Sequence, residues 1–376
     1  MSSVFLFPGQ GEQSPGMLHD LPAHPAASAA LGEVSAALGD DVRAHDAEQA
    51  LRSSASVQLA LFAAGVASWR TLDALGARPD YVAGESVGAF AAAVACGALA
   101  LPDAARAVRV RGQAMEKAYP YGYGMGVVLG LDEQTVTRLA GQAAEPAEPV
   151  YATNVNAPRQ ITVSGADAAI DRLLVLARTH GATKTERLPV DVPAHCPLMA
   201  GPEQELAAVL SVLPVARPRV PFAANRDGRT LRTASAVRED LVRSVACPVR
   251  WHEATSILYE RGARLFVQML PGDSLTRLAE AAFPGARATS LRAASPQHIL
   301  QFVRRESGVS GKRSGAGTSS CVTLDIRRDS TPIREESFHD HPRGTRHDGG
   351  PATHDDDRAR RHVRPAPGVR PDHDLR

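Results

Sequence analysis

The sequence predicts an α/β fold built around a serine on a tight turn between a strand and a helix. From Val4 to about Val303, short apolar runs typical of buried strands alternate with longer segments of helical periodicity. One such run, at 81–83, leads into Gly-Glu-Ser-Val-Gly at 84–88, which fits the G-x-S-x-G pattern of a nucleophile elbow. A small-residue helix is expected over 87–99. The pentapeptide alone also fits an ordinary Gly-Ser turn, so other residues must decide whether the serine is a nucleophile.

Composition and charge narrow the class of protein. The 376 residues carry a formal net charge of +1, which gives no electrostatic case for binding nucleic acid or an anionic membrane. No apolar run reaches the ~20 residues that span a bilayer, and the first residues lack the features of a signal peptide. We therefore expect a cytoplasmic protein. The cysteines have no paired spacing, which favours reduced thiols rather than a disulfide framework; they are Cys96, Cys196, Cys247 and Cys321, and no metal site is expected.

The main core is expected from 1–121 and 191–303. It begins with a buried strand, Val-Phe-Leu-Phe at 4–7, closed by the loop Pro-Gly-Gln-Gly at 8–11. The remaining predicted elements are helices over 57–75 and 101–115 and a late strand over 265–270 that ends at Pro-Gly.

The segment 122–190 is predicted to form an inserted subdomain. Strand-like stretches and helix-like stretches follow one another here in the order β-α-β-β-α-β, which is the ferredoxin-like split motif. The expected strands are 127–130, 150–153, 160–164 and 184–190, and the expected helices are 132–140 and 166–179.

The segment 304–376 has a different composition. Arg, His, Asp, Gly, Ser and Pro replace nearly every large apolar residue, so this stretch cannot build a core and is predicted to be a disordered tail. It holds six of the thirteen histidines, but their irregular spacing does not indicate a metal site. A native tail and a reading-frame change in the gene both explain the composition.

Six sequence blocks stand in an order that resembles the malonyl-CoA:acyl-carrier-protein transacylases. The resemblance runs from Met1 to about Val303 and implies an α/β-hydrolase-like core that carries a ferredoxin-like insertion. The blocks are Phe-Pro-Gly-Gln-Gly at 7–11, the serine pentapeptide at 84–88, Arg-Gly at 111–112, Asn-Val-Asn-Ala-Pro at 154–158, Pro-Ala-His-Cys-Pro-Leu-Met at 193–199 and Pro-Gly at 271–272.

Within that family, the segments 1–18 and 118–125 look like the epsilon subunit of malonate decarboxylase. That resemblance implies an acyl carrier protein subunit as acceptor, with the thiol of a CoA-like prosthetic group, and other decarboxylase subunits as partners. The near neighbour is the transacylase of fatty-acid or polyketide synthesis. No metal or redox cofactor is implied, and malonyl-CoA is the expected acyl donor.

Ser86 is the expected nucleophile, and it needs a general base within hydrogen-bond reach. The resemblance places His195, in an apolar segment between prolines, beside it. No acidic residue is identifiable as the third member of a catalytic triad. The resemblance implies that a backbone carbonyl orients the imidazole instead, and we expect it from the segment 247–251, at Arg250. The backbone N–H groups of Gln10 and Val87 are expected to hold the oxyanion.

Arg111 is the expected specificity residue, because a guanidinium can grip the free carboxylate of a malonyl group with charge-assisted hydrogen bonds worth ~1.5–3 kcal/mol. On its own it would read as a helix-surface arginine, as Arg106 and Arg109 do. The family's polar pocket positions are matched by Gln58, Asn154 and Asn156.

Glu85 departs from the pattern, since many family members carry histidine before the nucleophile. Its carboxylate could repel malonyl or turn away to pair with a basic neighbour, which we favour. The expected reaction is ping-pong transfer through a malonyl-serine ester. The alternative from another class is an inactive, carrier-binding scaffold subunit.

Overall fold

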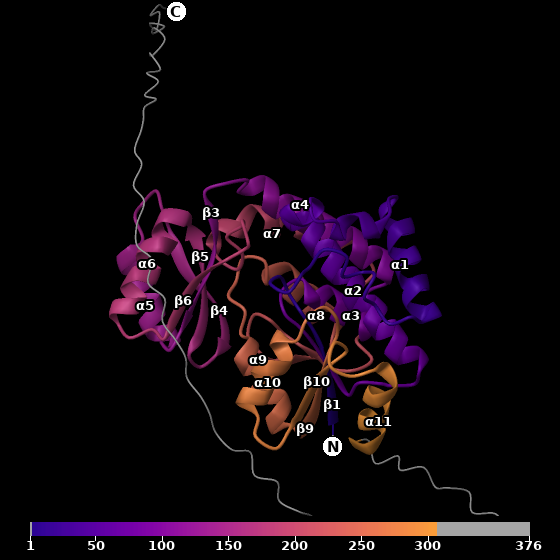
Figure 1. Ribbon diagram of the computed structural model, residues 1–376. Helices are drawn as coiled ribbons and strands as arrows, with labels where there is room; N and C mark the ends of the chain where they lie inside the picture. The colour runs from indigo at the N-terminus through magenta and orange to yellow at the C-terminus, as the bar shows by residue number, and fades with distance from the viewer. Residues whose placement is uncertain (1, 307–376) are drawn as a thin grey trace, which may run out of the picture. The chain divides into compact units, whose positions relative to one another are not determined.

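The computed structural model describes residues 2–306, which contain two β-sheets and their covering helices (Figure 1). The larger sheet has six strands in the order β10-β9-β1-β2-β7-β8, and all neighbours are parallel except β7 and β8. Its strands are β1 (Ser2–Phe7), β2 (Tyr81–Gly84), β7 (Phe222–Ala223), β8 (Thr230–Leu231), β9 (Ala263–Gln268) and β10 (Arg287–Ser290). The predicted α/β class is confirmed.

Both faces of the larger sheet are covered, which explains why β1 reads as a continuous apolar run. Successive side chains of a strand point to opposite faces, so Val4 and Leu6 pack in one cluster while Phe5 and Phe7 pack in another. The first cluster includes α9 (Trp251–Glu260) and α10 (Ser274–Ala282). The second includes α1 (Pro25–Leu38), α2 (Ser54–Ala74), α3 (Gly88–Ala95), α4 (Leu101–Ala118) and α11 (Pro296–Glu306), and Figure 1 shows α1 to α3 on the side of β1 away from α9.

The smaller sheet is antiparallel, with strand order β4-β5-β3-β6. Helices α5 and α6 pack on it over a separate apolar cluster that contains Val128, Ile161 and Leu173 (Figure 1). Along the chain the elements follow the β-α-β-β-α-β order; the division of the chain into subdomains stays a prediction. They are β3 (Tyr123–Leu129), α5 (Glu133–Ala143), β4 (Val150–Ala157), β5 (Gln160–Ala166), α6 (Asp167–Thr179) and β6 (Lys184–Leu188).

A backbone bridge joins β4 to the segment that precedes α9. The Val155 N–H donates to the Val249 carbonyl at 2.9 Å, and the Val249 N–H donates to the Thr153 carbonyl at 3.0 Å. The bridge brings the Asn-Val-Asn block at 154–156 toward the larger sheet, where the serine lies.

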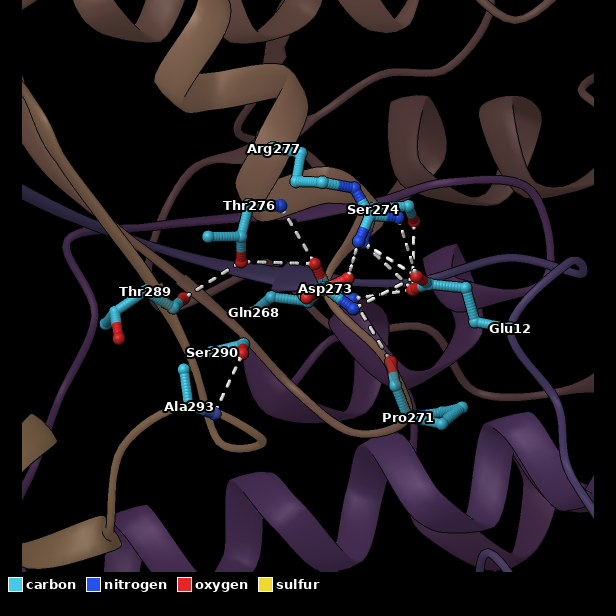
Figure 2. A network of polar contacts seen from close by, with 10 residues as sticks. All are labelled: Glu12, Gln268, Pro271, Asp273, Ser274, Thr276, Arg277, Thr289, Ser290 and Ala293. Atoms are coloured by element: carbon cyan, nitrogen blue, oxygen red, sulfur yellow. Dashed lines mark hydrogen bonds and ion pairs between the residues drawn. The ribbon is translucent and has the colours of Figure 1, made fainter. Parts of the chain in front are cut away.

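The loop after β1 is anchored by the carboxylate of Glu12, as Figure 2 shows. The Glu12 carboxylate accepts hydrogen bonds from the backbone N–H groups of Asp273 (3.1 Å) and Ser274 (2.9 Å) and from Gln268 Nε2 (3.1 Å). A carboxylate suits this place because the first N–H groups of α10 have no partner within the helix. The same contact explains the glycine at position 272, because a Cβ on Gly272 would overlap the Glu12 side chain.

Several helices and short strands of the C-terminal half were not individually predicted. They include α7 (Ala200–Val212), α8 (Ala234–Arg243), α9, α10 and α11. Helix α11 ends at Glu306, three residues beyond the predicted end of the core, and the rest of the predicted tail lies outside the described residues. None of the helices within 2–306 is long and apolar enough to cross a membrane.

Candidate active site

Ser86 lies on a sharp turn between β2 and α3, with a φ of 53° that non-glycine residues seldom adopt. The flanking glycines make this turn possible. A Cβ on Gly84 would overlap the backbone of Gly88, and a Cβ on Gly88 would overlap the Phe7 carbonyl of β1. The local geometry is therefore that of the nucleophile elbow expected from the sequence.

His195 lies beside Ser86, 109 residues away in sequence. Its Nε2 is 2.8 Å from Ser86 Oγ, and its Nδ1 is 2.6 Å from the Ser244 carbonyl oxygen. Because a carbonyl can only accept, we assign the ring proton to Nδ1, which leaves Nε2 to accept from the Ser86 hydroxyl. His195 also has a positive φ, 64°, and its backbone N–H donates to the Val245 carbonyl at 2.9 Å.

The prediction that Arg250 supplies the carbonyl for His195 is wrong, although the Cys247 backbone, in the same predicted segment 247–251, acts to raise the pKa of the ring. The Arg250 carbonyl accepts from the Ala254 N–H in the first turn of α9, and its guanidinium pairs with Glu133 and Glu253. Ser244 instead is the C-cap of α8, where the last carbonyls of a helix have no partner within the helix. The imidazole satisfies one of them.

The imidazole of His195 is held neutral. Its side chain is buried, and burial together with the nearby Arg111 cation lowers the pKa of His195 from 6.5 to about 3. A neutral ring whose Nε2 carries no proton can accept the proton of the Ser86 hydroxyl.

Arg111 projects from α4 onto the same serine and is only 1% exposed. One Nη donates to Ser86 Oγ at 3.0 Å, the other donates to Gln58 Oε1, and Nε has no partner among residues 2–306. Burial lowers the pKa of Arg111 from 12.5 to about 10, so the group stays cationic near neutral pH. Within the described chain no carboxylate lies in ion-pair distance of this cation.

The loop that carries Gln10 packs directly against the elbow. A Cβ on Gly9 would lie 3.0 Å from the Glu85 carbonyl oxygen and 3.5 Å from Ser86 Cβ, so a side chain there would push the loop and the elbow apart by a few tenths of an ångström. The backbone N–H groups of Gln10 and Val87 donate to no acceptor within 2–306, whereas the Ser86 N–H donates to Asn225 Oδ1 at 2.9 Å.

The other predicted pocket residues have different surroundings. Gln58 is fully buried and contacts Arg111, and Asn154 lies beside Glu85 with its own Oδ1 unpaired among the described residues. Asn156 also has an Oδ1 without a partner among residues 2–306, and within that range its side chain forms no hydrogen bond with Ser86.

Among residues 2–306 no basic side chain pairs with Glu85, contrary to our expectation. Burial raises the pKa of its carboxyl to about 7, while the Asn154 side chain and the Gly9 backbone act to lower it. Around neutral pH this carboxyl is therefore partly protonated, which lessens the repulsion of an anionic substrate.

Within residues 2–306 no group of three or more His, Cys, Asp or Glu side chains is arranged to bind a metal ion. Asn225, whose side-chain amide bonds to both Gly84 and Ser86, was not predicted from the sequence. Its only sequence signal is an asparagine in the turn-like stretch Asn-Arg-Asp-Gly at 225–228.

Comparison with known proteins agrees with this geometry. Residues 4–307 match the family described as the acyl transferase domain. The chain is 35% identical over 281 residues to the malonyl CoA-acyl carrier protein transacylase of Salmonella typhimurium, which covers 73% of this chain and 91% of that protein. The corresponding Escherichia coli protein is 34% identical with the same coverage.

Solved structures give the same result. The malonyl CoA-acyl carrier protein transacylase of Coxiella burnetii matches with a TM-score of 0.76 and 34% identity, covering 81% of this chain and 98% of that chain. A malonyl-transacylase in complex with its type II PKS acyl-carrier protein also matches with a TM-score of 0.76, at 33% identity, covering 80% of this chain and all of that chain. The chain belongs to the acyl transferase domain family.

Proposed function

We propose that the protein transfers a malonyl group from malonyl-CoA, through an ester on Ser86, to the thiol of an acyl carrier protein. The observation that carries this proposal is the buried Arg111 cation beside Ser86 and His195, which lacks an ion-pair partner within 2–306. A buried charge is costly unless it is paired, so the site favours an acyl group that brings its own carboxylate. Malonyl fits this requirement and acetyl does not.

The chemistry follows from the positions of the polar groups. As Ser86 Oγ attacks the thioester carbonyl, its proton passes to His195 Nε2, and the developing oxyanion lies within reach of the Gln10 and Val87 N–H groups. When the C–S bond breaks, the CoA sulfur takes that proton and leaves. In the second half-reaction His195 accepts the proton of the carrier thiol, whose sulfur attacks the malonyl ester, and then returns it to Ser86 Oγ. No residue outside this set needs to change its charge.

The names of the relatives support the choice of donor and acceptor. Those described above are named as malonyl CoA-acyl carrier protein transacylases, and one was solved with its acyl-carrier protein. A carrier of fatty-acid or polyketide synthesis is therefore the acceptor that we favour. An acceptor in malonate decarboxylase rests on the segments 1–18 and 118–125 alone and stays a prediction.

The decisive test is intact-mass spectrometry after incubation with malonyl-CoA. We expect a malonyl adduct on the wild-type protein and none on Ser86→Ala. Adding each carrier protein in turn should discharge the adduct and identify the acceptor. A wild-type protein that never forms the adduct would refute the transferase and leave the carrier-binding scaffold.

A further inference from the structure

We infer that Asn225 is a positioning residue that holds Ser86 in its reactive conformation; the inference deepens the proposed function and rests on Ser86 as its nucleophile. The side chain is 2% exposed and lies 139 residues from Ser86 in sequence. Its Oδ1 accepts the Ser86 N–H at 2.9 Å, and its Nδ2 donates to the Gly84 carbonyl at 2.8 Å. One amide therefore grips the chain on both sides of the elbow.

The elbow needs such a grip because its backbone is strained. A residue with a side chain at a φ of 53° lies about 1–2 kcal/mol above the ordinary regions, and it keeps that conformation only if the surroundings enforce it. Because α3 holds the chain after Ser86 in place, turning Ser86 toward an ordinary φ would rotate the preceding peptide unit, which breaks the bond from the Ser86 N–H to Asn225 Oδ1 and moves Oγ relative to His195. The Asn225 amide thus opposes the motion that would take Ser86 Oγ away from its base.

Asn225 is itself fixed by its backbone. Its N–H donates to Asp240 Oδ2 at 3.0 Å, and its carbonyl accepts the Arg250 N–H at 2.7 Å. Asp240 belongs to α8, the helix whose C-cap residue Ser244 orients His195. Ser86 and His195 are therefore both positioned relative to one helix, although neither belongs to it.

The bond to Asn225 also decides which backbone groups can act on the oxyanion. The Ser86 N–H is already donated, whereas the N–H groups of Val87 and Gln10 are free within the described chain. Releasing the elbow from Asn225 would change the direction of the Val87 N–H, because Val87 follows Ser86 directly. Loss of Asn225 should therefore affect the rate of acylation more than the binding of the donor.

The test compares Asn225→Ala with wild type in a single-turnover reaction. Rapid quenching and intact-mass detection give the acylation rate constant with malonyl-CoA and the fraction of protein that reacts. We expect the rate constant to fall about 10- to 100-fold, because the Gly84 carbonyl and Ser86 N–H lose buried partners. The dissociation constant of malonyl-CoA should change little, since Arg111 is untouched.

A structural role alone would give a different result. It would lower the melting temperature and the reacting fraction while each folded molecule reacted at the normal rate, and that outcome would overturn the inference. Thr71→Val is the matched control: it removes a buried hydrogen bond, from Thr71 Oγ1 to the Ala67 carbonyl in α2, and should leave the rate constant unchanged.

Asn225→Asp keeps the shape and the acceptor but removes the donor to Gly84, so it covers the case in which the alanine variant does not fold. We expect its rate constant to fall by at least about 5-fold; an unchanged value would also overturn the inference. Acylation of Ser86 by p-nitrophenyl acetate separates this inference from the proposed function, because that ester needs no malonyl recognition. An Asn225 defect with p-nitrophenyl acetate would stand even if malonyl-CoA proved not to be the donor.

Discussion

Replacing Arg111 by methionine should make the protein more stable and less selective at the same time. Methionine retains much of the side-chain length but removes the cation from a position that is 1% exposed. Arg111 contacts Ser86 Oγ and Gln58 Oε1, and neither partner carries a charge. The unliganded protein therefore holds a guanidinium that only a bound anion would neutralise.

The expected gain in stability follows from the pKa of Arg111. Burial lowers it from 12.5 to about 10, and at about 1.36 kcal/mol per pKa unit this corresponds to a destabilisation of roughly 3 kcal/mol. The destabilisation is fully present below the folded pKa, hence at neutral pH, and fades as the pH rises from about 10 toward 12.5. Methionine leaves Gln58 Oε1 without its donor, which costs about 1 kcal/mol. The net expectation is about 2 kcal/mol of stabilisation and a melting temperature higher by a few degrees.

The loss of selectivity follows from the two Nη groups. If together they contribute about 3 kcal/mol to holding the malonyl carboxylate, Arg111→Met should lower the specificity constant for malonyl-CoA by about 100-fold relative to that for acetyl-CoA. Initial rates with both thioesters and thermal unfolding without ligand measure the two effects. Arg106→Met, an exposed position of the same helix, is the control and should change neither. Equal losses for both thioesters, or a lower melting temperature, would refute the reasoning.

Three further predictions concern the elbow and its surroundings. Because the pKa of His195 falls to about 3, acylation by p-nitrophenyl acetate, an uncharged ester that the titrating Glu85 carboxyl does not repel, should keep its rate as the pH drops from about 7 to 4.5 in single turnover; a decline centred near 6.5 would show a solvated imidazole. Gly88→Ala should destabilise the protein by at least about 2 kcal/mol in urea unfolding, since its Cβ would overlap the Phe7 carbonyl, whereas Gly141→Ala has open space and should not. Gln10→Ala retains its backbone N–H, so acylation should change less than about 3-fold; a 100-fold loss would assign the role to the side chain.

The parts of the site that the sequence predicts are those encoded by local geometry. The two glycines at 84 and 88 have a steric reason that involves only the next turn and the adjoining strand, so the elbow can be recognised from five residues. The central strands β1, β2 and β9 are likewise visible because both faces of the sheet are covered there and most of their positions are apolar, whereas the short strands β7, β8 and β10 were not predicted. Helices such as α8 and α10 escaped individual prediction because their apolar faces are short and interrupted by charged residues.

The residues that sequence reasoning misplaced act through contacts between distant segments. Ser244 orients His195 because a helix ends there, and no glycine or proline marks that end in the sequence. Asn225 is a single asparagine in a turn-like stretch, and only the fold reveals that its amide lies against Ser86. Arg250 was assigned by analogy with the family, but its carbonyl is used by α9.

Among residues 2–306, Ser86 and His195 are the only non-glycine residues with a positive φ. Such strain persists only where other contacts hold it in place, and here those contacts converge on α8. Asp240 fixes the backbone that carries Asn225 and thus Ser86, while the Ser244 and Val245 carbonyls accept from the ring and the backbone of His195. A small shift of α8 would therefore disturb Ser86 and His195 together, whereas α4 carries Arg111 alone of these three side chains. On the proposed mechanism, the fold thus separates the positioning of the nucleophile and base from the choice of acyl group.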